Sequence, residues 1–154
     1  MKKIYLAGSC SKEKRSRMEN IAADLREKGY EVYCPFELKI PNAWDYSQED
    51  WAKMVFDKDV AAIDECDFIV MISDGRLSSA GTNWEQGYAY AKGKAIFVFQ
   101  WEHCDTSLMT YCGCTRFLNL RDFAGATNHI ADFPYEMYIR RKDRGYNPCC
   151  TILT

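Results

Sequence analysis

Two carboxylates in this chain stand out as groups that could act together. Glu85 follows a loop of small residues, Ser78-Ser79-Ala80-Gly81, at the expected start of a helix, where exposed backbone N–H groups can bind an anion. Asp59 lies in another expected helix. Its neighbours three and four positions away are all apolar: Val55, Phe56, Ala62 and Ile63. A carboxylate on such a face is expected to have a raised pKa, which suits a general acid.

Two carboxylates in different environments are the arrangement that breaks glycosidic bonds, because one attacks the anomeric carbon while the other protonates the leaving group. Here Asp59, with its raised pKa, would suit the role of the acid. Each residue also has a purely structural interpretation. Thr82-x-x-Glu85 matches a capping box, in which the glutamate only satisfies the helix start. Asp59 could be a partly buried carboxylate paired with a basic residue or with the backbone.

A third candidate is the turn Gly8-Ser9-Cys10-Ser11, which follows an apolar, strand-like run. Its hydroxyl and backbone N–H groups could bind a phosphate. The turn lacks the lysine of a P-loop, so the sequence does not predict Walker-type nucleotide binding. Gly-Ser turns are common, so this signal is weak by itself.

The elements that must position these residues alternate between strand and helix. Strands are expected at 3–8, 30–34, 67–73, 95–99 and 116–120, and helices at 12–28, 47–65, 82–92 and near 135–142. This alternation predicts an α/β fold in a single domain, 1–154, with a parallel sheet covered on both faces. Ligands of such sheets bind beyond the carboxyl ends of the strands, where the loops after Ala7, Ser73 and Phe99 lie.

Composition narrows the classes of partner. The formal net charge is -2, and no basic face suggests a polynucleotide. No signal peptide is visible and no apolar run approaches the roughly 20 residues that span a bilayer, so we expect a cytoplasmic protein without membrane contact. The eight cysteines form no Cys-x-x-Cys pair. We therefore expect neither a metal nor another cofactor.

Three segments together resemble the nucleoside 2-deoxyribosyltransferase family. They are Ile4-Tyr5-Leu6-Ala7-Gly8-Ser9, Asp59-x-x-x-Ile63-x-x-Cys66-Asp67 and Gly81-Thr82-x-x-Glu85-x-Gly87-Tyr88-Ala89-x-Ala91-x-Gly93-Lys94. The resemblance covers about two thirds of the chain, and the third segment is the most specific. It implies a flavodoxin-like, doubly wound sheet of five parallel strands. It also implies that Glu85 forms a glycosyl-enzyme ester, that Asp59 assists departure of the base, and that Tyr5 hydrogen-bonds the Glu85 carboxylate.

Two departures from the family pattern concern the 5' end of the sugar. Members usually carry aspartate six residues before the nucleophile, where this chain has Ser79. They usually carry asparagine in an Asn-Leu-Met stretch contributed by a neighbouring subunit, where this chain has Ser107-Leu108-Met109. With Ser9, three serines would surround the 5' position, and the lost carboxylate would no longer repel a phosphate. This pattern resembles a sister group, the 2'-deoxynucleoside 5'-monophosphate N-glycosidases and related CMP hydrolases, in which water accepts the sugar.

The sequence thus predicts an N-glycosidase of (2'-deoxy)nucleoside 5'-monophosphates. Its catalytic residues would be Glu85, Asp59 and Tyr5, and its substrate-binding residues Gly8, Ser9, Ser79, Gly81 and Ser107. A transferase that exchanges bases between deoxynucleosides and a non-catalytic nucleotide-binding module are the alternatives.

Two further expectations concern the base and the assembly. The residues Trp44, Tyr46, Gln48, Glu49 and Trp51 could line the base pocket, although each also has a structural interpretation. The family resemblance implies a homodimer or larger homo-oligomer in which Ser107 reaches the active site across the subunit interface.

Overall fold

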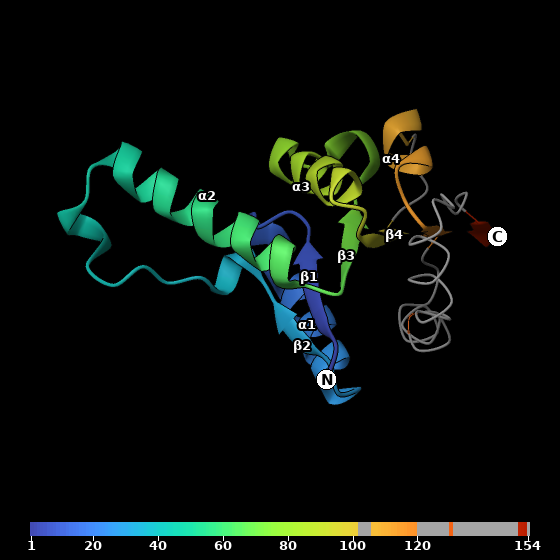
Figure 1. The fold of residues 1–154 in the computed structure, drawn as a ribbon, viewed down its shortest axis with the longest axis horizontal. Coiled ribbons are helices and arrows are strands. Elements are labelled where there is room, and N and C mark those ends of the chain that lie inside the picture. Colours follow the sequence, from blue (N-terminus) through green and yellow to red (C-terminus); the bar gives the residue numbers. More distant parts are fainter. Residues whose placement is uncertain (102–105, 120–129, 131–150, 154) are drawn as a thin grey trace.

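The computed structural model describes residues 1–101, 106–119, 130 and 151–153. Its centre is a parallel sheet with helices on both faces (Figure 1). The strands are β1 (Lys3–Ala7), β2 (Glu31–Tyr33), β3 (Phe68–Ser73), β4 (Ala95–Gln100), β5 (Arg116–Asn119) and β6 (Thr151–Leu153), in the spatial order β2-β1-β3-β4-β5-β6. The first five are the predicted strands, and their order is that of a flavodoxin-like sheet. The short β6 extends this sheet beyond β5 and was not predicted.

The α-helices are α1 (Arg15–Glu27), α2 (Gln48–Glu65), α3 (Ala80–Ala91) and α4 (Leu108–Cys112), and short 3-10 turns lie at Lys12–Lys14, Pro35–Glu37, Ala43–Asp45 and Gly75–Leu77. The predicted helix 12–28 is therefore a 3-10 turn followed by α1. Helix α3 begins two residues earlier than predicted. The predicted helix near 135–142 lies outside the described residues.

The alternation of side chains along β1 divides the core into two layers. Ile4 and Leu6 pack with α1 on one face of the sheet, while Tyr5 and Ala7 belong to the cluster on the opposite face, which α2 and α3 cover. The central strands β3 and β4 are buried at every position, as expected for parallel strands covered on both faces. Tyr5 consequently lies under the two helices that carry the candidate carboxylates.

The strand order reverses next to β1, because the chain passes from β1 outward to β2 and then returns to β3 on the other side. Such a switch point opens a crevice at the carboxyl ends of the two central strands. Helix α2 starts well outside the sheet and runs back over it, so its N-terminal half projects beyond the strands (Figure 1). The inner half of α2 therefore lies close to β1. None of the described helices combines the length and the apolar character needed to cross a membrane.

Candidate active site

Two stacked tyrosines lie next to the candidate carboxylates. Tyr5 on β1 and Tyr33 on β2 are directly paired in the register of the two strands. Their ring centroids are 5.4 Å apart and their planes differ by 20°. The Tyr33 hydroxyl donates a hydrogen bond of 2.8 Å to Asp59 Oδ1. Tyr5 is fully buried, and its hydroxyl has no hydrogen-bond partner in the structure.

Glu85 lies in the second turn of α3, facing Tyr5. Its Oε2 is the other buried oxygen of the site without a hydrogen-bond partner. The pKa of Glu85 is raised to about 8, chiefly by burial, with the Tyr5 phenol opposing the rise and the charge of Asp59 adding to it. Burial, followed by the charges of Glu85 and Asp59, also raises the pKa of Tyr5. The phenol therefore stays protonated and can donate to Glu85.

Asp59 approaches the same space from α2. Burial raises the pKa of Asp59, as the sequence predicted, and the hydrogen bond from Tyr33 partly offsets this rise. Its partner is thus a phenol and not a basic residue. Burial thus raises the pKa of both carboxylates, and the charge of Asp59 adds to the rise at Glu85.

The two carboxylates share the wall of an apolar groove of about 380 Å³. The groove is lined by Trp51, Ala52, Val55, Phe56, Asp59, Val60, Ile63, Gly81, Trp84 and Glu85. Phe56 and Trp84 meet edge to face at 5.2 Å between ring centroids. The surface beside the carboxylates is therefore aromatic and poor in hydrogen-bonding groups, which suits contact with a planar ring.

Trp51 also borders a neighbouring hollow of about 440 Å³. The other residues of that hollow are Ala43, Trp44, Tyr46, Ser47 and Gln48. Of the residues predicted near the base, only Trp51 lines the groove that holds both carboxylates, and Glu49 lines neither hollow. Trp44 is almost wholly exposed.

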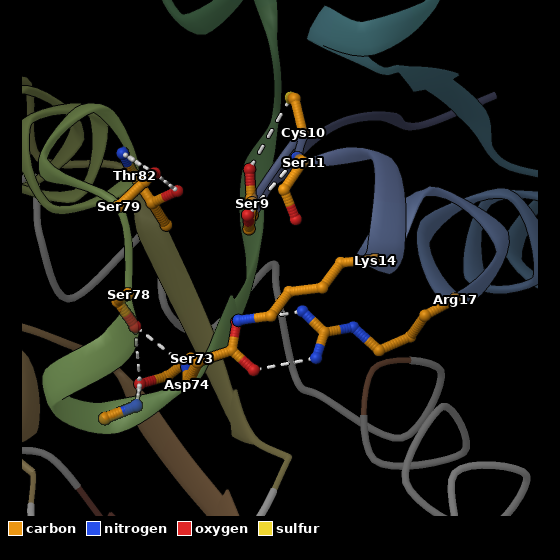
Figure 2. Close-up of polar contacts among 12 residues, drawn as sticks. Ser9, Cys10, Ser11, Lys14, Arg17, Ser73, Asp74, Ser78, Ser79 and Thr82 are labelled. Atoms are coloured by element: carbon orange, nitrogen blue, oxygen red, sulfur yellow. Dashed lines mark hydrogen bonds and ion pairs between the residues drawn. The ribbon is translucent and has the colours of Figure 1, made fainter.

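A second polar cluster lies where the loops after β1 and β3 meet (Figure 2). Asp74, directly after β3, accepts two hydrogen bonds from the Arg17 guanidinium at 2.7 and 2.9 Å. The Lys14 ammonium lies 2.9 Å from the same carboxylate. Burial alone would raise the pKa of Asp74, but the hydrogen bonds from Arg17 and Lys14 lower it overall. Asp74 is therefore ionised, and the cluster carries a net charge of about +1.

The loop after β1, with Ser9, Cys10 and Ser11, lies beside this polar cluster (Figure 2). Ser9 Oγ accepts a hydrogen bond of 3.3 Å from the backbone N–H of Ser11. A Cβ added at Gly8 would lie 2.6 Å from Met18 Cε and 2.8 Å from its Sδ. A side chain at Gly8 would thus require Met18 to move, so glycine allows this loop to pack closely on α1.

Ser79 caps helix α3. Its Oγ accepts a hydrogen bond of 3.1 Å from the backbone N–H of Thr82 and lies 2.6 Å from Thr82 Oγ1. The capping box proposed for Thr82 and Glu85 is therefore wrong, because the helix begins at Ala80 and Ser79 already satisfies its first turn. Glu85 therefore does not cap the helix. The sequence signal was misleading because Ser79 and Thr82 both suit a helix start.

Ser107 caps α4, where its Oγ accepts a hydrogen bond of 3.1 Å from the backbone N–H of Met109. It lies in a separate hollow lined by Gly75, Arg76, Asn83, Thr106, Ser107 and Thr110. Within one chain, Ser107 does not line the groove of Glu85 and Asp59. Its contribution across a subunit interface stays a prediction.

Sequence reasoning missed Tyr33, Gln86 and the pair of Lys14 and Arg17. Tyr33 was predicted only as part of a strand. A second tyrosine on the strand next to that of Tyr5 was a usable signal. Gln86, next to the candidate nucleophile, donates hydrogen bonds of 2.9 Å to the carbonyls of Thr110 and Gly113 and so ties α3 to the end of α4. Lys14 and Arg17, one helical turn apart after the Gly8 loop, were also detectable as a pair.

No cluster of three or more histidine, cysteine, aspartate or glutamate residues suited to a metal ion occurs in the part of the chain that the structure describes.

Comparison with known proteins gives the site its context. Residues 4–135 match the family model for nucleoside 2-deoxyribosyltransferase. The 2-deoxyribosyltransferase of Bacillus psychrosaccharolyticus is similar in structure, with a TM-score of 0.73, 26% identity, and coverage of 88% of this chain and 95% of the other. No curated protein sequence matches significantly.

Two more distant structures share the fold. The CMP N-glycosidase BcmB of Clostridium botulinum has a TM-score of 0.58 and 23% identity over 86% of this chain and 100% of its own. A conserved protein of Enterococcus faecalis V583 has a TM-score of 0.57 and 17% identity over 100% of this chain and 91% of its own. With the family model matching most of its length, this chain belongs to the nucleoside 2-deoxyribosyltransferase family and is an enzyme of the nucleoside N-glycosidic bond.

Proposed function

We propose that this enzyme hydrolyses the bond between base and sugar in (2'-deoxy)nucleoside 5'-monophosphates. The observation that carries the proposal is the pairing of Glu85 with Asp59 on one wall of an aromatic groove, with each carboxylate facing its own tyrosine hydroxyl. The aromatic lining of the groove suits a planar base, and the two carboxylates would supply the nucleophile and the acid that glycosidic cleavage requires.

In the first step, ionised Glu85 attacks C1' of the sugar and forms an ester. The C1'–N bond breaks, its electron pair stays on the base nitrogen, and Asp59 transfers its proton to the base. The step therefore needs a protonated Asp59 beside an ionised Glu85, and burial, which raises the pKa of Asp59, suits it to this role. Tyr5 assists by donating to Glu85 and so favouring its ionised form.

In the second step, water attacks C1' and the ester bond to Glu85 breaks. The Glu85 carboxylate leaves with its electron pair, and the proton released by water goes to the Asp59 carboxylate. Both side chains then return to their starting states. Covalent catalysis of this kind divides one difficult displacement into two easier ones.

The charge around the crevice supports a monophosphate substrate. Ser79 places a neutral hydroxyl at the start of α3, where helical N–H groups attract anions. The neighbouring carboxylate of Asp74 is neutralised by Lys14 and Arg17, so it presents little repulsion. Gly8, Ser9, Ser79 and Gly81 would bind the sugar and its 5'-phosphate. Ser107 would complete the site from a neighbouring subunit of a homo-oligomer.

Base exchange between deoxynucleosides is the alternative activity. It is favoured by the family match and by the similarity to the Bacillus transferase. In that reaction a second base, and not water, attacks the glycosyl-Glu85 ester. A non-catalytic module that only binds nucleotides is a second alternative, and the paired carboxylates argue against it.

Incubation with dCMP, dGMP, CMP and the corresponding nucleosides, followed by chromatography of the released bases, tests the proposal. We expect free base from a monophosphate and much less from its nucleoside. A parallel reaction of thymidine with adenine tests exchange. Formation of deoxyadenosine faster than hydrolysis of any monophosphate would make the enzyme a transferase, and binding without either reaction would leave only the module.

A further inference from the structure

Tyr33 contacts the acid of the reaction without lining the groove. It is the last residue of the edge strand β2, and it is half-buried between the Tyr5 ring and α2. Its hydroxyl lies 2.8 Å from Asp59 Oδ1. Each tyrosine thus has its own carboxylate. Tyr5 faces Glu85, and Tyr33 donates a hydrogen bond to Asp59.

The chemistry of the phenol fixes the direction of this hydrogen bond. Burial, followed by the contact with Asp59, raises the pKa of Tyr33 above its usual value. The hydroxyl therefore keeps its proton throughout the range in which carboxylates titrate, and it donates to Oδ1. A neutral carboxyl group that accepts at Oδ1 carries its own proton on Oδ2.

We infer that Tyr33 is a positioning residue for Asp59 in the reaction proposed above. By occupying Oδ1, Tyr33 presents the transferable proton on Oδ2 and fixes the orientation of the carboxyl group. After the proton has moved to the departing base, the same hydrogen bond stabilises the carboxylate that remains. The inference rests on the proposed function for its catalytic consequence, but the contact itself is independent of any substrate.

Among the titratable groups near Asp59, Tyr33 is the one that stabilises its carboxylate. The other titratable groups that couple with Asp59 are Tyr5 from β1, Cys10 from the following loop and Glu85 from α3. None of them is a cation, and on α2 itself the neighbours three and four residues away are apolar. Among the described residues, Tyr33 is the group that lowers the pKa of Asp59 against the effect of burial.

A purely structural role for Tyr33 would reside in its ring, which stacks on Tyr5. The variant Tyr33→Phe keeps that ring and removes only the hydroxyl. A matched control is Tyr30→Phe, since Tyr30 precedes the same strand but packs on the opposite face of the sheet, edge to face with Phe68 at 5.9 Å. Both variants lose one phenolic hydroxyl, and only one of them contacts Asp59.

The kinetic test compares two leaving groups. On dGMP, Tyr33→Phe should lower kcat/KM by about 10- to 100-fold, as expected for a lost hydrogen bond to a charged group. On the 7-methylguanine analogue, whose cationic base leaves without taking a proton, the loss should be below about threefold because general acid catalysis is not needed. Tyr30→Phe should leave both rates unchanged. Equal losses on the two substrates would overturn the inference.

The pH profile gives a further readout that a structural role would not alter. Loss of the donor destabilises the Asp59 carboxylate and raises its pKa, so the alkaline limb of the kcat/KM profile should move to higher pH in Tyr33→Phe. An unmoved limb would contradict the inference.

A titration separates this inference from the proposed function, because it needs no substrate. In the Glu85→Gln background, carbon-13 NMR follows the Asp59 carboxyl group without the coupled charge. Adding Tyr33→Phe should raise the measured pKa of Asp59 by about 1. If the pKa stays unchanged, the inference fails whatever the enzyme hydrolyses. If the pKa rises but the wild-type enzyme cleaves no N-glycosidic bond, only the proposed function fails.

Discussion

The hydroxyl of Ser79 accepts a hydrogen bond from the backbone N–H of Thr82 at 3.1 Å and thereby caps the helix that carries Glu85. The residue that the sequence singles out for phosphate selectivity is thus also the N-terminal cap of α3. Substitutions at Ser79 must preserve the cap if they are to report on the substrate. Aspartate and asparagine both cap helices as well as serine does, and they differ in charge.

The variant Ser79→Asp should therefore fold normally and lose monophosphate hydrolysis selectively. A carboxylate near a phosphate costs about 4 kcal/mol at 4 Å and an effective dielectric of 20, before screening by salt. We expect kcat/KM for the monophosphate to fall by at least about tenfold, with a smaller change for the nucleoside. Ser79→Asn, the neutral cap, is the control. Equal losses in both variants would show that the charge at Ser79 does not select the substrate.

Removal of the Glu85 carboxylate should abolish turnover. Glu85→Ala should lower kcat by about 10³-fold or more, as expected when a covalent nucleophile is lost. Mass spectrometry of the wild-type enzyme quenched during turnover should show the mass of one glycosyl group on the peptide that contains Glu85. A glycosyl adduct on another residue, or a fully active Glu85→Ala variant, would refute the assignment.

The strands along the chain and the burial of Asp59 were predictable because they follow from local patterns, whereas the flavodoxin-like sheet was implied by the family resemblance. Continuous apolar runs indicated β3 and β4, and the apolar neighbours of Asp59 indicated its partial burial and raised pKa. Both signals depend on residues close in the sequence. The start of α3 was misplaced because Ser79 and Thr82 compete as caps, and only the backbone path of the preceding loop decides between them.

Contacts between distant segments were not predictable in the same way. The pairing of Tyr33 with Asp59 spans 26 positions and requires the register of β1 and β2 together with the path of α2. The pairing of Arg17 with Asp74 spans 57 positions. Each residue alone has an ordinary surface interpretation, so their roles emerge only when the sheet places them together.

The protonation of Glu85 should make stability depend on pH in an unusual direction. Its pKa rises from 4.5 to about 8 on folding, chiefly through burial. A carboxyl group with a raised folded-state pKa contributes its full stability below the unfolded value and loses it as the pH rises toward the folded value. We therefore expect the urea midpoint of the wild-type protein to fall between about pH 4.5 and pH 8.

Glu85→Gln should flatten that dependence, because the amide is neutral throughout and keeps the shape of the side chain. Above pH 5 the variant should therefore be more stable than the wild-type protein, with the difference growing toward about pH 8. Glu65→Gln removes an exposed carboxylate at the end of α2 and should preserve the wild-type profile. A Glu85→Gln curve parallel to that of the wild-type protein would show that Glu85 is not the group responsible.

Asp74 should show the opposite behaviour. The side chains of Asp74 and Arg17 are 8% and 10% exposed, so removing the carboxylate leaves a buried cation without its partner. Asp74→Asn should lower the free energy of unfolding by about 3–5 kcal/mol, measured by urea denaturation at pH 7. Because Arg17 and Lys14 lower the pKa of Asp74 on folding, the stability from this group should be present above about pH 3.8, its unfolded value, and be lost as the pH falls below it.

Asp24→Asn provides the comparison for this last prediction, since Asp24 forms a more exposed pair with Lys28 on the surface of α1 at the same 2.9 Å as the contact from Lys14 to Asp74. Exposed pairs contribute about 0–1 kcal/mol, so Asp24→Asn should change stability little. If both variants lost the same small amount of stability, the ion pairs of Asp74 would contribute no more than an exposed pair does. A large loss confined to Asp74→Asn would instead establish that the loops after β1 and β3 are held together by this buried contact, beside the site that we propose for the phosphate.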